Sequence, residues 1–426
     1  MSHSTTLWPG PAAGTAQHLP TLTAHLRAMR AVLAVVQHGS TMRAAEAMHL
    51  SQPAVARSVL QLEQACGLPL FMRGARGMMP TTLGGQLATR IQAMLQHLSS
   101  GAAEAQAAAT LATRRSPLPR RFSEIVPASH LRALMAIADC GSEAQAAQSL
   151  GLTQPAVHLA LQGLETSLGL QLFYKLTFGT RLTPAGEALQ RRVKLAFAEV
   201  RGMDSDISAW RGEMRGRVVI GVLPLSVSIF LPRAVAMLAE SHPDIEVSIV
   251  DGTYESLMQQ LLSADIDAIA GALRDDAPRD EVNQHQLFVD DLVVIAPAGH
   301  PCLQIKGLTL DQLRQWPWVA PLPGTPADRA MVQLFRAQGL EPPSGCLRAS
   351  SPSITLAFVL QTGHLALASS GQALQDNHGG QLAIVPIALP TTRRRIGLAT
   401  RALSTASQDL ELFMQACVQA ANEVLG

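Results

Sequence analysis

The sequence predicts a multidomain chain in which two similar helical units come before a long helix and an α/β half. Three observations predict this fold class: an internal repeat, a heptad of apolar residues, and an alternation of strand-like and helix-like segments in the second half. A length of 426 residues with 47% hydrophobic residues suffices for several packed cores. The chain is therefore expected to divide into several domains.

The internal repeat is gapless and has an offset of 102 residues. The run Leu50–Val55 reads Leu-Ser-Gln-Pro-Ala-Val, and its counterpart Leu152–Val157 reads Leu-Thr-Gln-Pro-Ala-Val. Two copies are too few for a solenoid, which needs at least three repeats to bury its faces. Each copy is instead expected to form a small domain.

The first copy has the signals of a helix-turn-helix. An apolar stripe at helical spacing ends at Gly39 and predicts a first helix. We expect Thr41 to cap a second helix, and Ser51 to cap a third that has Pro53 near its start. Two helices, a short turn and a third capped helix make this motif. Glycines within 69–81 predict a two-stranded wing after it.

A long helix follows the second copy. Apolar residues there recur at alternating steps of four and three, namely Leu189, Val193, Ala196, Val200, Met203, Ile207, Trp210 and Met214. Such a heptad is typical of helices that pair with another helix, although an amphipathic helix packed on its own domain is the alternative. After the first copy, a shorter apolar series is expected to fade within the alanine-rich run 101–112, which leaves a short helix and a linker.

The second half alternates strands and helices. Apolar runs at 218–222, 246–250 and 266–271 predict strands, with helices at 226–241 and 256–262 between them. This βαβαβ order implies parallel strands with right-handed crossovers. Further strands are expected at 292–296, 318–320, 365–368, 383–386 and 396–400.

Charge is divided unevenly between the two halves. Residues 1–212 have 19 lysines and arginines against 11 acidic residues, a net charge of +8, whereas residues 213–426 have a net charge of −7. This asymmetry predicts that the first half binds a polyanion and that the second does not.

The repeat motifs resemble those of the LysR-type transcriptional regulators, whose winged helix-turn-helix has a run like S-Q-P-A-V-S-R. The first copy reads Ser-Gln-Pro-Ala-Val-Ala-Arg over Ser51–Arg57, and the second reads Leu-Thr-Pro-Ala-Gly over Leu182–Gly186. The second half resembles the periplasmic-binding-protein-like effector domain of that family, with a ligand cleft between two subdomains. The departure is the second helix-turn-helix, because such regulators ordinarily have one.

This resemblance implies a fold class of two all-α winged helix-turn-helix copies, a long linker helix and an α/β effector domain of two subdomains. The predicted parts are an N-terminal extension expected to be disordered (1–22), copy 1 (23–85), a short helix and linker (86–127), copy 2 (128–186), a dimerisation linker helix (187–215) and an effector-binding domain (216–426). Within the last, subdomain I covers about 216–291 and 391–426, and subdomain II about 292–390.

The first copy is expected to be the primary DNA reader. Arginine is the commonest side-chain partner of guanine, and Arg57 is expected on the outer face of the third helix. The start of that helix favours a phosphate. The predicted DNA-binding residues are Arg43, Ser51, Gln52, Pro53, Ala54, Arg57, Ser58, Arg73 and Arg76.

The second copy is expected to bind DNA more weakly. It has Leu159 where the first copy has Arg57, and residues 130–192 have a net charge of only +1, against +5 for 25–90. Its predicted secondary contacts are Thr153, Gln154, Pro155, His158 and Lys175. The alternative is an equal second reader with a different sequence preference.

The effector site is expected beyond the carboxyl ends of the strands, where helix N-termini favour anions. The predicted effector-binding residues are Ser226, Thr253, Pro323, Gly324, Thr325, Ser351 and Ser353. They imply a small, anionic metabolite. The alternative is that each of them only caps its own helix.

The sequence contains no HExxH, GxSxG or P-loop pattern, so we expect no enzyme, no catalytic residues, no metal and no cofactor. Expected partners are double-stranded DNA, a small-molecule effector and further copies in a homodimer or homotetramer, with RNA polymerase as a candidate. Five separated cysteines, with neither a signal peptide nor a membrane span, predict a cytoplasmic protein. The rival hypotheses are a solute sensor whose helix-turn-helix units bind protein, and an enzyme that uses the cleft.

Overall fold

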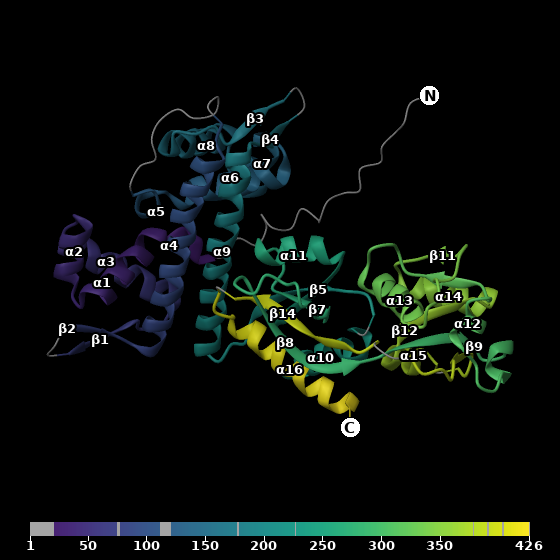
Figure 1. Cartoon of the computed structure of the whole chain (residues 1–426). Coiled ribbons are helices and arrows are strands. Elements are labelled where there is room, and N and C mark those ends of the chain that lie inside the picture. Colours follow the sequence, from purple (N-terminus) through teal and green to yellow (C-terminus); the bar gives the residue numbers. More distant parts are fainter. Residues whose placement is uncertain are drawn as a thin grey trace. The chain divides into compact units, whose positions relative to one another are not determined.

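The computed structural model describes residues 21–74, 77–110, 121–176, 179–225, 227–377, 379–389, 392–402 and 404–425. It separates into two compact units (Figure 1). The first unit comprises 1–216 together with Ser404–Gln408, and the second comprises 217–403 together with 409–426. The predicted N-terminal extension lies outside the described residues except for its last two.

The first copy forms the expected winged helix-turn-helix, here called the first head. Its elements are η1 (Thr21–His25), α1 (Leu26–His38), α2 (Thr41–Met48), α3 (Gln52–Cys66), β1 (Phe71–Gly74) and β2 (Gly77–Pro80). The cap of α2 differs from the prediction, because Ser40 Oγ accepts the Arg43 N–H at 3.2 Å and Thr41 is the first helical residue. Ser51 stands at the N-cap of α3 but makes no side-chain capping bond.

The second copy, here called the second head, has the same element order. Its elements are α5 (Phe122–Ile125), α6 (Ala128–Cys140), α7 (Glu143–Leu150), α8 (Gln154–Leu168), β3 (Phe173–Lys175) and β4 (Thr180–Leu182). The equivalence extends to backbone detail. Gly151, with φ of 64°, ends α7 where His49, with φ of 55°, ends α2. The tight turn therefore requires a left-handed residue in both heads, and only the second head uses glycine for it.

Each head continues into a long helix, and the two helices have equal lengths. Helix α4 (Thr82–Ala108) and helix α9 (Pro184–Trp210) each contain 27 residues. The expectation that the first of these fades near Gly101 was therefore wrong. Alanine has the highest helix propensity, and Ala102 and Ala105 are fully buried in the core of this unit, so the alanine-rich run continues the helix.

Helices α4 and α9 pack against each other in antiparallel orientation (Figure 1). The end of α4 meets the start of α9, where Arg192 Nε donates to Glu104 Oε1 at 2.8 Å. The start of α4 meets the end of α9, where Trp210 Nε1 donates to Gln86 Oε1 at 3.0 Å. One continuous cluster of buried apolar residues joins both heads and both helices.

A buried arginine lies within this helix pair. Arg90 is only 4% exposed, and its Nε donates to Asp206 Oδ2 at 2.6 Å. Its Nη1 lies 3.4 Å from Glu199 Oε2. The guanidinium also donates to the backbone carbonyls of Thr405 and Ala406, at 3.0 and 2.9 Å. These bonds hold the segment Ser404–Gln408 on the helix pair of the first unit.

The second unit contains two five-stranded sheets. The first has the order β6-β5-β7-β14-β8 and is formed by β5 (Gly216–Val222), β6 (Ile245–Asp251), β7 (Ala268–Ala272), β8 (Val282–Asp290) and β14 (Arg394–Arg401). Its helices are α10 (Val227–Ser241), α11 (Tyr254–Leu262) and α16 (Gln408–Leu425). Strands β5 and β7 are parallel, as the βαβαβ order predicts.

The second sheet has the order β11-β10-β12-β9-β13. Its strands are β9 (Leu292–Pro297), β10 (Trp318–Ala320), β11 (Leu347–Arg348), β12 (Leu365–Ser369) and β13 (Leu382–Ile384). The helices around it are η2 (Pro301–Gln304), α12 (Leu310–Leu313), α13 (Pro326–Arg336), α14 (Pro352–Thr362) and α15 (Ser370–Asp376). This two-sheet α/β architecture confirms the predicted fold class.

Strand β8 has no counterpart among the predicted strands. It lies at the edge of the first sheet, and its central residues Asn283–Gln286 are polar and largely exposed. An edge strand needs no continuous apolar run, so the search for such runs missed it.

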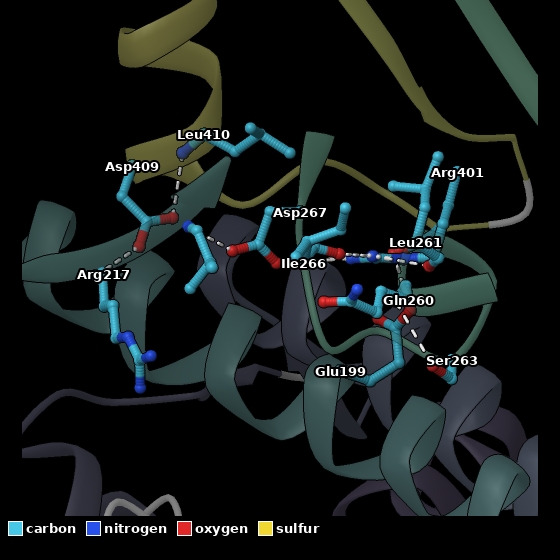
Figure 2. A network of polar contacts seen from close by, with 12 residues as sticks. Glu199, Arg217, Gln260, Leu261, Ser263, Ile266, Asp267, Arg401, Asp409 and Leu410 are labelled. Carbon is cyan, nitrogen blue, oxygen red and sulfur yellow. Dashed lines mark hydrogen bonds and ion pairs between the residues drawn. The ribbon is translucent and has the colours of Figure 1, made fainter. Parts of the chain in front are cut away.

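Charged side chains bond backbone groups in the first sheet of the second unit (Figure 2). Asp409 Oδ2 accepts the backbone N–H of Arg217 at 3.0 Å, which joins α16 to the start of β5. Arg401 Nη1 donates to the carbonyl of Ile266 at 2.6 Å and to that of Leu261 at 3.1 Å. These bonds tie the C-terminal segments to the rest of this subdomain.

Candidate functional site

The outer face of α3 is formed by the residues that follow its N-terminus. Ser51, Gln52, Pro53 and Arg57 are exposed, while Val55 and Val59 on the opposite face are buried. Among the residues that the structure describes, the Arg57 guanidinium has no hydrogen-bond or ion-pair partner. A helix that exposes small and polar residues at its start and an unpaired arginine one turn later suits a major groove.

The other predicted contacts of the first head divide into four groups. Arg43 on α2 is exposed, and Gln52 Nε2 donates to Thr41 Oγ1 at 3.3 Å, which links α2 to α3. Ser58 is only 9% exposed, because it lies three residues after the buried Val55 and so on the same face of α3, and its placement on the outer face was wrong. Ala54 is half-buried. Arg76 and the side chain of Arg73 lie outside the described residues.

The second head presents a different outer face on α8. Leu159 is 66% exposed at the position equivalent to Arg57. Thr153, Gln154 and Pro155 are exposed at the start of the helix, and Lys175 is exposed on β3. His158 Nδ1 lies 3.0 Å from the Glu143 carboxylate, so this histidine is engaged by an acid of α7. The equivalent positions of the first head are Ala56 and Thr41, which form no ion pair.

The predicted effector residues lie at the starts of three helices. Thr253, Thr325 and Ser351 each accept the backbone N–H at the third position of their own helix. The capping alternative therefore describes their hydroxyl oxygens correctly. Pro323, Gly324 and Ser353 are exposed, and Ser226 lies outside the described residues. Within the described residues, no hydrogen bond joins one of these three helix starts to another.

A small hollow lies beyond the ends of β5 and β7, next to Thr253. Its lining is mostly apolar, and it includes Leu223, Tyr254, Gly271, Leu273, Arg274 and Ala399. The Arg274 guanidinium carbon lies 3.4 Å from the centre of the Tyr254 ring, a cation–π contact. The Tyr254 hydroxyl and Arg274 Nε are buried and have no hydrogen-bond partner among the described residues. Burial raises the pKa of Tyr254, and nearby Arg274 opposes that rise.

Sequence reasoning missed Tyr254 and Arg274. The signal available was the position of Tyr254 directly after Thr253, at the carboxyl end of a strand of the parallel sheet. Arg274 is distant in sequence and joins the tyrosine only through the fold. Among the described residues, no group of three or more histidines, cysteines or acids is placed to hold a metal ion.

Two family models match the chain. The model described as a bacterial regulatory helix-turn-helix protein of the lysR family matches residues 26–85 and again residues 128–187. The model described as the LysR substrate binding domain matches residues 211–422. The chain belongs to the LysR family. This regulator is accordingly a DNA-binding transcriptional regulator with an effector-binding domain, and it has the helix-turn-helix twice.

Relatives of this LysR-family protein support the same conclusion. The HTH-type transcriptional regulator GalR of Pseudomonas putida is 32% identical over 382 residues, which cover 88% of this chain and 92% of that protein. YdcI of Escherichia coli, an uncharacterized HTH-type transcriptional regulator, is 25% identical over 69% of this chain and 96% of its own length. A full-length OxyR variant from Pseudomonas aeruginosa shares the fold, with a TM-score of 0.55 at 19% identity, over 68% of this chain and 93% of that one.

The relatives are transcriptional regulators, which as a family are not enzymes. In the described part of this LysR-family chain, no helix combines the length and apolarity needed to cross a membrane.

Proposed function

We propose that this LysR-family regulator reads DNA chiefly through its first head and responds to a small anionic metabolite. The exposed and unpaired guanidinium of Arg57 on α3 is the observation that carries the DNA part of the proposal. Arg57 donates to the edge of a guanine, while Ser51 and the N-terminus of α3 bind a phosphate. Arg43 binds a flanking phosphate. Through Gln154 and Lys175, the second head makes weaker contacts.

A binding assay against the promoter region of the chain's own gene tests the DNA part. We expect affinity to fall steeply with salt, because phosphate contacts release counterions. Arg57→Ala should weaken binding by about 5- to 150-fold, since a base contact of this kind contributes about 1–3 kcal/mol of discrimination. Arg336→Ala removes an exposed arginine from the second unit and serves as the charge-matched control, with no effect expected.

Two results would contradict the proposed reading of DNA by the first head. If Arg57→Ala leaves binding unchanged while substitutions of Gln154 and His158 abolish it, the second head is the primary reader. If the wild-type chain binds DNA without salt dependence, or binds only protein, the helix-turn-helix units do not act as proposed.

The effector part of the proposal concerns the hollow beside Thr253. Its buried Tyr254 hydroxyl and Arg274 Nε are unpartnered donors, and Arg274 Nη1 pairs with Glu255 Oε1 at 3.3 Å. The hollow has only about 10 Å³, room for one water molecule, so in this proposal the effector widens the hollow and its carboxylate takes the place of that of Glu255. The dipole at the start of α11 adds a favourable field for a carboxylate. The helix-dipole part of this argument also applies to the starts of α13 at Thr325 and α14 at Ser351.

Thermal unfolding with a panel of small carboxylic acids and their uncharged amides tests this part, because a ligand that binds the folded state raises the melting temperature. We expect acids to stabilise the protein and amides to fail. Tyr254→Phe should reduce that stabilisation, whereas Tyr174→Phe, which changes the other tyrosine of the chain, should not. Equal stabilisation by acids and amides would contradict an anionic effector.

The remaining partners are also proposals. We place the protein in the cytoplasm as a homodimer or homotetramer, with RNA polymerase as a partner on DNA. Sedimentation of the purified chain measures the oligomeric state, and a pull-down with purified polymerase on promoter DNA tests that contact.

A further inference from the structure

The apolar faces of the two long helices cover each other within one chain. Helix α9 buries Leu189, Val193, Ala196, Val200, Met203 and Ile207, which are six members of the predicted heptad. Helix α4 buries Leu87, Ile91, Met94, Leu98, Ala102 and Ala105. All of these residues belong to one core cluster. The seam that was assigned to a second chain is therefore filled by the chain itself.

The polar contacts of the seam follow a two-fold pattern. Arg90 on α4 pairs with Asp206 on α9, with Nε and Oδ2 2.6 Å apart. The repeat offset makes Arg192 the equivalent of Arg90, and Glu104 the equivalent of Asp206. Arg192 and Glu104 indeed form the second pair, at 2.8 Å. A contact that recurs with its partners exchanged is the signature of a two-fold interface.

The acceptors, but not the donors, follow the same exchange where the helix pair holds the recognition helices α3 and α8. Arg211, directly after α9, donates from Nε to the carbonyl of Cys66 at 2.9 Å, at the end of α3. Gln106 on α4 donates to the carbonyl of Leu168 at 2.7 Å, at the end of α8. Cys66 and Leu168 are equivalent residues. Each recognition helix is thus bonded at its last turn to the chain segment that follows the other head.

When a two-fold axis relates two antiparallel helices, two equivalent groups that point along this axis point in the same direction. Each wing packs near the start of the long helix that follows it, so the two wings lie at opposite ends of the antiparallel pair, while the heads touch where Arg30 donates to the carbonyls of Ser123 and Val126 (Figure 1). If α3 faces one way along the axis, α8 faces the same way. The two recognition helices are therefore presented together to one ligand rather than to opposite sides.

The heads differ in what they offer a base pair. Arg57 in the first head is a hydrogen-bond donor suited to guanine. Leu159, 66% exposed at the equivalent position, can only make an apolar contact, for which the methyl group of thymine is the partner in a major groove. The Glu143 carboxylate, which pairs with His158, repels DNA phosphates, whereas the first head has the uncharged Thr41 at the equivalent position.

From these observations we infer that a single chain presents a complete pair of DNA-reading heads, and that its DNA partner is a duplex with two unlike half-sites. The first head binds a half-site that contains guanine, and the second head binds one that contains thymine at the matching position. Further copies of the chain associate through surfaces other than the α4–α9 seam. This inference rests on the proposed DNA-reading function.

Cross-linking tests the pairing of the helices without any DNA. Gln86 and Trp210 are both exposed and their side chains are hydrogen-bonded, so Gln86→Cys combined with Trp210→Cys places two accessible thiols together. After treatment with a short bismaleimide, we expect these two positions to be linked in a species with the mass of one chain. The two single variants control for the native cysteines. Linkage only in a species of twice that mass, or no linkage between these positions, overturns the inference.

Footprinting on the promoter region tests the unlike half-sites. We expect Arg57→Ala to weaken protection of one half-site by about 5- to 150-fold, and Leu159→Ala to weaken the other by roughly 3- to 10-fold. If both substitutions affect the same half-site, or if the two half-sites have the same sequence, the inference is overturned. Loss of all salt-sensitive DNA binding would instead refute the proposed function, and the cross-linking result would remain unaffected.

Discussion

The two heads and the long helices that follow them share a backbone plan, a common core and equal helix lengths, but matched positions differ in charge and in burial. The clearest case is the pair of ion pairs on the long helices. Arg90 is 4% exposed and also bonds Glu199 and two carbonyls, whereas its equivalent Arg192 is 28% exposed and bonds only Glu104 among the described contacts. The two equivalent ion pairs therefore contribute unequally to the free energy of unfolding. The reason is that an acid left without its arginine destabilises the folded state more when it is buried.

The largest expected difference is the loss of stability when the arginine of each ion pair is removed. Arg90→Ala leaves Glu199 and Asp206 without their buried partner, so we expect a loss of about 3–5 kcal/mol in the free energy of unfolding. Arg192→Ala should cost less than about 1 kcal/mol, because Glu104 remains solvated. Urea denaturation of both variants measures the difference. Equal losses would show that burial of Arg90 is not what distinguishes the two pairs.

A second asymmetry lies at Asp204, whose equivalent in the other long helix is the buried Ala102. Burial raises the pKa of Asp204 to about 7. Because this pKa is above that of the unfolded chain, ionisation disfavours the folded state, and stability should fall as pH rises from about 4 to about 7.

Asp204→Asn should remove this pH dependence and stabilise the protein at pH 8 by up to about 4 kcal/mol, since each pKa unit corresponds to about 1.4 kcal/mol. Urea unfolding at pH 5 and pH 8 measures the change. A variant that keeps the full pH dependence would assign it to other groups.

Restoring an arginine to the second head should reduce the difference between the heads. Leu159→Arg places a guanidinium on the exposed face of α8, at the position of Arg57. We expect its half-site preference to shift towards guanine by about 1–3 kcal/mol. Selection of binding sequences from a randomised half-site measures the shift, with Arg57→Leu as the reciprocal variant.

The smallest effect is expected from the acid of α7. Glu143→Gln releases His158 and removes a negative charge from the side of the second head that we propose to face DNA. DNA binding should tighten by less than about 1 kcal/mol, and the gain should shrink at high salt, because the repulsion it removes is screened. A gain that does not depend on salt would contradict an electrostatic cause.

The repeat motifs and the apolar patterns were enough to predict both heads, the wings and most strands. They could not predict that α4 runs on to Ala108, because its last turns are stabilised by packing against α9 rather than by a pattern of their own. The heptad in α9 predicted a partner helix, but periodicity cannot tell a second chain from an earlier part of the same chain.

The site was predictable to different extents. The exposure of Arg57 and Leu159 followed from helical spacing, whereas Ser58 lies at the margin of the buried stripe, where spacing alone does not decide burial. Tyr254 and Arg274 come together through the fold, from α11 and the loop after β7. A contact of this kind needs tertiary structure, because neither residue has a motif that points to the other.

The segment Ser404–Gln408 has a mechanical consequence. Because it belongs to the first unit while the residues on both sides of it belong to the second, the chain crosses between the units three times. A domain attached by one crossing is released by one cut in the chain, whereas a domain attached by three crossings is not. A protease that cuts only between 216 and 217 therefore leaves the two units joined covalently on both sides of Ser404–Gln408.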